Sequence, residues 1–155
     1  MHCQAHPEDD ELCPPAGSWV PPRITRPGWA LPPPETRIKA AVVMAPAGIL
    51  FDAKGLSGAT VPVRIYRAEH DRLVRNAWNA DHVAALLPRQ PEVATVPGDH
   101  FVFLVPCPAE LAVRVPESCQ DAAGIDRSAI HRRIAVELVD FFDRTLGPAH
   151  KAATP

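Results

Sequence analysis

The chain has 155 residues, of which 46% are hydrophobic and 22% charged, and a formal net charge of -2. This composition is typical of a globular domain with a buried core, and it offers no basic surface for a phosphate backbone, so we expect no nucleic-acid partner. The longest apolar stretch, residues 40–53, contains Pro46 and Gly48. It is shorter than the roughly 18 residues that span a bilayer, so we expect no membrane span.

Proline dominates the N-terminal part of the chain. Eight of the 19 prolines lie between residues 14 and 34. Because each proline removes a backbone donor and fixes φ, we predict an extended loop there. Trp19 and Trp29 lie in this loop, where they either anchor it to the folded part or line a pocket. The chain is thus divided into a Pro-rich, Cys-containing loop segment (residues 1–35), a folded domain (36–148) and a tail (149–155).

Strands and helices alternate after this loop, which is typical of an α/β fold with a parallel sheet. Three short apolar runs predict strands that are covered on both faces. Arg64 interrupts the second run and indicates either an edge strand or a side chain that reaches solvent. Asp126 is the predicted N-cap of the last helix. The predicted strands are residues 38–44, 61–66 and 92–96, and the predicted helices are residues 77–87 and 127–146.

Asp71 follows the second predicted strand and His100 follows the third. Catalytic groups of open parallel sheets gather in the crevice beyond the carboxyl ends of the strands, so we expect these two side chains to meet there. An aspartate in this position fixes the tautomer of the histidine, which then acts as general base for a nucleophile. Glu69 is the main alternative acid, because residues 69 and 71 point to the same side of an extended chain.

Five segments carry these elements in a characteristic order: RIKAAVVMAPA, VPVRIYRAEHD, NADHVAALLP, VPGDHFVFLVPC and HRRIAVELVDFFDRTLG. Together they resemble the dienelactone-hydrolase-like and platelet-activating-factor-acetylhydrolase-like branch of the α/β-hydrolases. The resemblance implies the C-terminal part of that fold, with about three parallel strands and crossover helices. It also implies hydrolysis of a small-molecule carboxylic ester without a cofactor, with Asp71 as the acid of the catalytic triad and His100 as its base. Phe101 and Phe103 would line the pocket or support its floor.

The chain contains no G-x-S-x-G elbow, the strand-to-helix turn that presents the catalytic serine in this fold. The nearest pattern, GLSG at residues 55–58, has the wrong spacing and is predicted to lie in a loop before a strand. We therefore expect a truncated serine esterase that lacks its nucleophile and is inactive alone. The alternative is a non-catalytic fragment or interaction module, whose exposed sheet edge beside residues 38–44 pairs with another chain.

The four cysteines form two local pairs, Cys3 with Cys13 and Cys107 with Cys119. An even number of closely spaced cysteines predicts disulfides in an oxidising compartment. A zinc site in the N-terminal segment is the competing interpretation, but its spacing matches no common zinc motif, and we expect no metal. The ligands of such a site would be His2, Cys3, His6 and Cys13.

The expected location depends on whether the chain is complete. Disulfides persist in oxidising compartments, and the resemblance also implies a secreted or periplasmic protein. Residues 1–13 are polar and acidic, unlike a signal peptide. We therefore expect a signal peptide upstream of this sequence, or a cytoplasmic location if the chain is complete.

Overall fold

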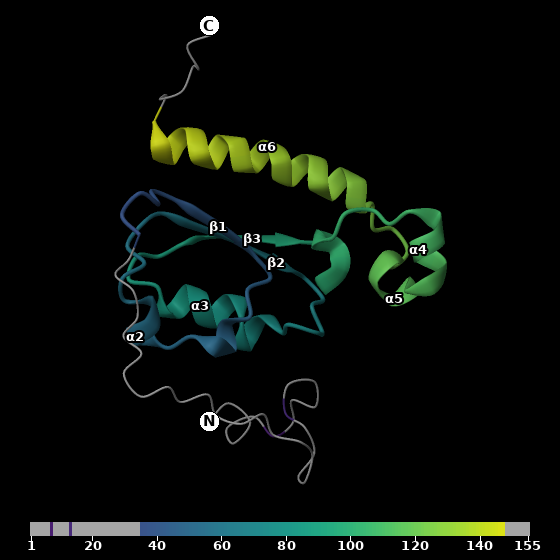
Figure 1. The fold of residues 1–155 in the computed structure, drawn as a ribbon, viewed down its shortest axis with the longest axis horizontal. Helices are drawn as coiled ribbons and strands as arrows, with labels where there is room; N and C mark the ends of the chain where they lie inside the picture. Colours follow the sequence, from purple (N-terminus) through teal and green to yellow (C-terminus); the bar gives the residue numbers. More distant parts are fainter. Residues whose placement is uncertain (1–6, 8–12, 14–34, 148–155) are drawn as a thin grey trace, which may run out of the picture. The chain divides into compact units, whose positions relative to one another are not determined.

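The described part of the chain folds around a parallel β-sheet. The computed structural model describes Pro7, Cys13 and residues 35–147. Its sheet has three strands in the order β1-β2-β3, each parallel to its neighbour (Figure 1). This confirms the α/β character of the fold and the parallel sheet. The strands are β1 (Ala41–Met44), β2 (Val63–Ala68) and β3 (Glu92–Val96).

Two strand boundaries differ from the predicted ones. β1 begins at Ala41 instead of residue 38, and the N–H of Ala41 donates to Pro62 O at 3.0 Å. β2 begins after Pro62, which has no N–H, and it continues to Ala68 because its last residues still pair with β3. β3 has the predicted bounds. Within the described sheet β1 pairs with β2 alone and is an edge strand; the pairing of this edge with another chain stays a prediction.

Helices cover both faces of the sheet. Figure 1 shows α3 (Ala80–Leu86) on one face and α6 (Arg127–Leu146) on the other. Successive side chains of β2 alternate between these faces, so each helix shares an apolar cluster with the sheet. The cluster on the α3 side contains Val63, Ile65, Ala80 and Val83. The cluster on the α6 side contains Tyr66, Ala68, Val96, Val102, Ile130 and Ile134.

One of the two predicted helices is correct and the other is interrupted. α6 has the predicted bounds, and the Asp126 side chain accepts a hydrogen bond from Ala129 N at 2.8 Å, which confirms the predicted N-cap. The helix predicted over residues 77–87 is divided by the buried Asn79, whose φ of -123° and ψ of -88° are not helical. The Asn79 amide holds this break by donating to Arg75 O at 2.9 Å. The residues before it form a short 3-10 helix, η2 (Asn76–Trp78).

Several short helices were not predicted. The loop expected at residues 55–58 begins inside α2, where the Asp52 side chain accepts from Gly55 N at 2.6 Å. Ser57 follows α2 and donates to Lys54 O at 2.8 Å, so this serine precedes a strand and is no strand-to-helix elbow. The short elements are the 3-10 helices η1 (Gly48–Leu50) and η3 (His100–Phe103) and the α-helices α2 (Ala53–Leu56), α4 (Ala109–Arg114) and α5 (Pro116–Cys119).

Arg64 lies in the central strand and is largely buried, with its side chain 14% exposed. Its guanidinium donates to Glu92 of β3 at 2.8 Å and to Glu137 of α6 at 2.7 Å. Glu137 also accepts from the Tyr66 hydroxyl at 2.9 Å. The charge of Arg64 is therefore compensated within the fold, and neither the edge strand nor the solvent-reaching side chain predicted from the sequence is found.

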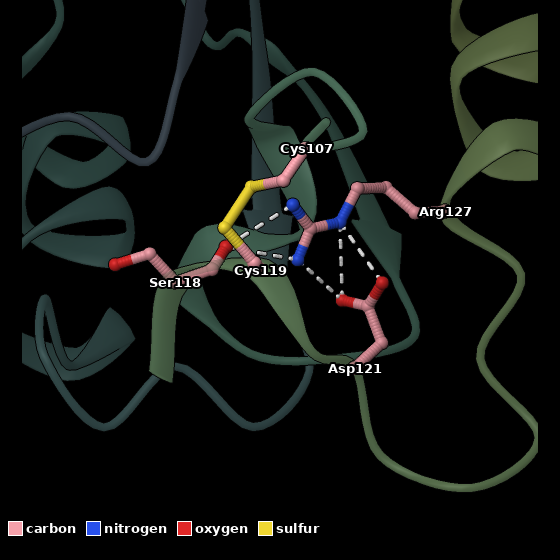
Figure 2. Close-up of a disulfide and its surroundings, with 5 residues drawn as sticks. All are labelled: Cys107, Ser118, Cys119, Asp121 and Arg127. Atoms are coloured by element: carbon pink, nitrogen blue, oxygen red, sulfur yellow. Dashed lines mark hydrogen bonds and ion pairs between the residues drawn. A yellow bond between two sulfur atoms is a disulfide. The ribbon is translucent and has the colours of Figure 1, made fainter. Parts of the chain in front are cut away.

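Between η3 and α6, a disulfide closes residues 107–119 into a loop, which we call the disulfide loop. Cys107 and Cys119 are bonded, as predicted. Figure 2 shows the Arg127 guanidinium beside this bond, where it donates to Ser118 O at 3.2 Å and to Asp121 at 2.8 Å. The disulfide and this ion pair therefore fix the end of the loop to the first turn of α6.

Several predictions concern groups of residues that lie wholly or partly outside the described ones. These are the Cys3–Cys13 pair, the N-terminal zinc alternative with its two histidines, and the positions of Trp19 and Trp29. In residues 35–147 no helix combines the length and the apolarity needed to cross a bilayer.

Candidate active site

The loops that follow β2 and β3 leave the sheet side by side. Beyond the last strand residues, Glu69 N donates to Val96 O at 2.8 Å and His70 N donates to Gly98 O at 2.9 Å. These bonds extend the pairing of the two strands past their carboxyl ends. The next residues, Asp71 on one loop and His100 on the other, are therefore held close together.

Asp71 and His100 form a hydrogen-bonded pair. Asp71 Oδ2 lies 3.0 Å from His100 Nδ1, and the Asp71 side chain is fully buried, whereas that of His100 is 26% exposed. Because an ionised carboxylate can only accept, this contact places the ring proton on Nδ1 and leaves the Nε2 lone pair available. No group in residues 35–147 forms a hydrogen bond with Nε2. The predicted contact is present, and the catalytic roles of the two residues stay predictions.

Local hydrogen bonds fix the Asp71 side chain and the loop that carries His100. The second oxygen of Asp71, Oδ1, accepts from Val74 N at 2.6 Å. On the opposite loop, the Asp99 side chain caps η3 by accepting from Phe101 N at 3.1 Å. Gly98 has a φ of +108°, and a Cβ at this position would lie 3.2 Å from Val102 Cβ, so the turn requires glycine. Both side chains are therefore preorganised by their own loops.

The environment raises the pKa of His100. The hydrogen bond to Asp71 contributes most, and the negative charges of Asp71 and Asp99 add to it, whereas partial burial acts in the opposite direction. The carboxylates thus favour the imidazolium form, which makes Nε2 a stronger base than that of a free histidine. This is the electrostatic property that a general base needs in order to accept a proton from a hydroxyl.

The other candidate residues lie apart from this pair or beside it. Glu69 is exposed and forms no hydrogen bond with His100 within the described residues, so Asp71 is the acid that meets the histidine. The Phe101 ring contacts the His100 ring edge-on, with centroids 5.5 Å apart. Phe103 packs against the core cluster of α6 and lines an apolar groove of about 230 Å³. The pocket-lining roles of both phenylalanines stay predictions.

Two contributors to this site were missed in the sequence. The sequence pattern assigns no role to Asp99, but its side chain caps η3. Asn76 was given no role, but its amide donates to Ala68 O at 2.7 Å and ties η2 to the end of β2. An aspartate that accepts from the N–H two residues later is a recognisable Asx pattern, so the role of Asp99 could have been found in the sequence. The role of Asn76 depends on a tertiary contact.

The described residues contain no partner for His100 that would act as a nucleophile. Of the serines at positions 57, 118 and 128, none forms a hydrogen bond with His100. In the same residues no three histidine, cysteine, aspartate or glutamate side chains are grouped so that they could hold a metal ion. The geometry thus supplies an acid and a base.

Replacing Asp71 by asparagine is expected to lower the pKa of His100 toward its ordinary value of about 6.5, because the main cause of the upward shift is removed. NMR titration of the His100 ring measures this directly. Glu69→Gln, which removes a neighbouring carboxylate without contact to His100, serves as the control and should leave the titration in place. An unchanged His100 titration in Asp71→Asn would contradict the assigned cause.

The same shift links stability to pH. The pKa of His100 is higher in the folded state, so its contribution to stability is full below the unfolded value of about 6.5 and is lost as the pH rises through the folded value. Asp71→Asn should remove this part of the pH dependence.

The chain matches no family model, no curated protein and no solved structure at a significant level.

Proposed function

We propose that Asp71 and His100 are the acid and the general base of an ester-hydrolase site of the α/β-hydrolase type. The observation that carries this proposal is the contact between Asp71 Oδ2 and His100 Nδ1, at 3.0 Å and beyond the carboxyl ends of two parallel strands. Ligands of open α/β sheets bind at this edge. The segments that resemble dienelactone hydrolases support the same assignment and name carboxylic esters as the substrate class.

The proposed chemistry uses the free ring nitrogen. His100 Nε2 takes the proton from an attacking hydroxyl as its oxygen bonds to the ester carbonyl carbon, and the Asp71 carboxylate stabilises the imidazolium that forms. His100 then gives this proton to the leaving alcohol as the tetrahedral intermediate collapses. A hydroxyl must lie about 2.6–3.2 Å from Nε2 for the first transfer. Asp71 and His100 thus supply the acid and the base, and the attacking hydroxyl belongs to a different group.

Hydrolysis of an activated ester tests the base without requiring a serine, because an imidazole base can also activate water. By itself the chain is expected to be inactive as a serine esterase, but its acid–base pair should speed the direct attack of water on p-nitrophenyl acetate above the buffer rate, and this rate should rise with pH through the raised pKa of His100. Because general base catalysis contributes about 100-fold or more, His100→Ala should remove an acceleration of that order. The measurement is the release of p-nitrophenolate over a range of pH.

His70→Ala is the matched control, since His70 is exposed and lies one residue from Asp71. It should leave the rate unchanged. Equal rates in His100→Ala and the unmodified chain would contradict the proposal, as would equal losses in both histidine variants.

A fluorophosphonate distinguishes the source of the hydroxyl, because it labels a serine that a neighbouring histidine activates. Since the sequence contains no G-x-S-x-G elbow, we expect no labelling of this chain by itself. Labelling that depends on His100 would overturn this expectation and identify the nucleophile by mass spectrometry.

A further inference from the structure

The outer side of α6 carries an exposed stripe that the core does not use. Val136 is 71% exposed and Val139 is 63% exposed, although both are large apolar residues. At 3.6 residues per turn they share one side of the helix with Arg132 and Asp143, opposite the buried Ile134 and Phe141. Figure 1 shows no labelled element on this side of α6. We call these four residues, 132, 136, 139 and 143, the outer stripe.

The charges of the outer stripe differ from those of the neighbouring flank. On that flank, Arg133 pairs with Glu137 at 3.5 Å and Arg144 pairs with Asp140 at 3.0 Å, each within the helix. Within residues 35–147, no ion pair includes Arg132 or Asp143. Asp143 also lies in the last turn of α6, where a negative charge opposes the helix dipole. The outer stripe thus has two exposed valines in its middle and charges of opposite sign at its two ends. Neither charge has an ion-pair partner within residues 35–147.

We propose that α6 packs antiparallel against α6 of a second copy of this chain through the outer stripe. The stripe is complementary to itself, because both of its residue pairs share one midpoint, between residues 137 and 138. A two-fold axis through that midpoint places Val136 opposite Val139 of the second copy and Arg132 opposite Asp143 of the second copy. Each dimer then contains two apolar contacts at its centre and two ion pairs at its ends.

The order of the charges along the outer stripe favours a second copy in the antiparallel orientation. A parallel arrangement would place each charge of the stripe opposite its own copy and would repel, so the charges favour the antiparallel two-fold pair. Near-antiparallel helices that cross at about 20° stay in contact over several turns, which the 20 residues of α6 allow. Because only a narrow stripe is buried, the dimer belongs to the small and weakly associating class of interfaces. This inference does not depend on the proposed function.

Sedimentation of the full chain tests the proposal. We expect a reversible monomer–dimer equilibrium at concentrations up to about 1 mM, the weak end of measurable affinity. Val136→Glu should abolish the dimer, because it places a charge opposite a valine. Val113→Glu, which changes an 82% exposed valine on α4, is the matched control and should leave the dimer intact. A chain that stays monomeric throughout this range, or equal effects of the two variants, would overturn the proposal.

Charge reversal identifies the contact. Arg132→Asp or Asp143→Arg alone should weaken the dimer about tenfold, because two attractive pairs become repulsive. The double variant should recover the affinity of the unmodified chain. The folds of these variants are checked by circular dichroism, and Asp143→Arg is favourable to the helix dipole of the monomer. A double variant no tighter than the single ones would overturn the antiparallel pairing.

Discussion

Asp121→Ala is expected to lower the free energy of unfolding by about 3–5 kcal/mol, because it leaves a buried charge without its partner. The Arg127 side chain is only 4% exposed and that of Asp121 is 15% exposed. The guanidinium donates to both carboxylate oxygens, with Nε to Oδ2 at 2.9 Å and Nη2 to Oδ1 at 2.8 Å. Urea denaturation followed by circular dichroism measures the change.

Two further variants make this expectation specific. Asp140→Ala removes one of the two carboxylate partners of Arg144, in an exposed pair with side chains 65% and 50% exposed, and should cost less than about 1 kcal/mol. Replacing both buried partners, by Asp121→Leu with Arg127→Met, should recover most of the loss, because no uncompensated charge remains. If Asp121→Ala lowered the free energy of unfolding as little as Asp140→Ala, the buried pair would not be a major contribution to the stability of the fold.

Phe141→Ala is expected to destabilise the fold by about 3–5 kcal/mol through lost apolar burial and the cavity that remains. Phe141 is 1% exposed and lies on the inner side of α6, with its ring edge-on to Phe142 at a centroid distance of 5.3 Å. Thermal and urea unfolding both report the loss.

Phe142→Ala provides the comparison, because this neighbouring ring is only partly buried. It should cost less than half as much as Phe141→Ala. Equal losses for the two variants would contradict the placement of Phe141, and not Phe142, on the buried side of α6.

The longer elements could be predicted from local signals. β3 has the predicted bounds because it is flanked by Pro91 and Pro97, which cannot donate a backbone hydrogen bond. α6 has the predicted bounds because Asp126 caps it and Gly147 follows it. The helices α4 and α5 are too short for a periodic pattern, at 6 and 4 residues, and could not be recognised in this way. The break at Asn79 is held by the bond to Arg75 O and also by a bond from Ile49 N, 30 residues away, which a local pattern does not contain.

The candidate pair could be predicted from its place after two neighbouring strands. Alternation along an extended chain could not choose between Glu69 and Asp71, however, because it places both on the same side. The structure decides between them: Glu69 N still belongs to the ladder with Val96, and the chain then turns so that Asp71 Oδ1 accepts from Val74 N. The turn spans only three residues, but its place in the chain depends on where β2 stops pairing with β3. The capping by Asp99 is a local pattern that the sequence contains, whereas the glycine requirement at position 98 depends on the position of Val102.

The sequential strand order has a consequence for biosynthesis. Each strand pairs with the next one along the chain, so the sheet can assemble stepwise as the polypeptide leaves the ribosome. The helix that covers one face, residues 127–146, follows all three strands in the sequence and is synthesised after them. Until it emerges, the apolar side of the nascent sheet that carries Tyr66 and Val96 lacks its cover and is open to chaperones, and the docking of this helix ends that exposure.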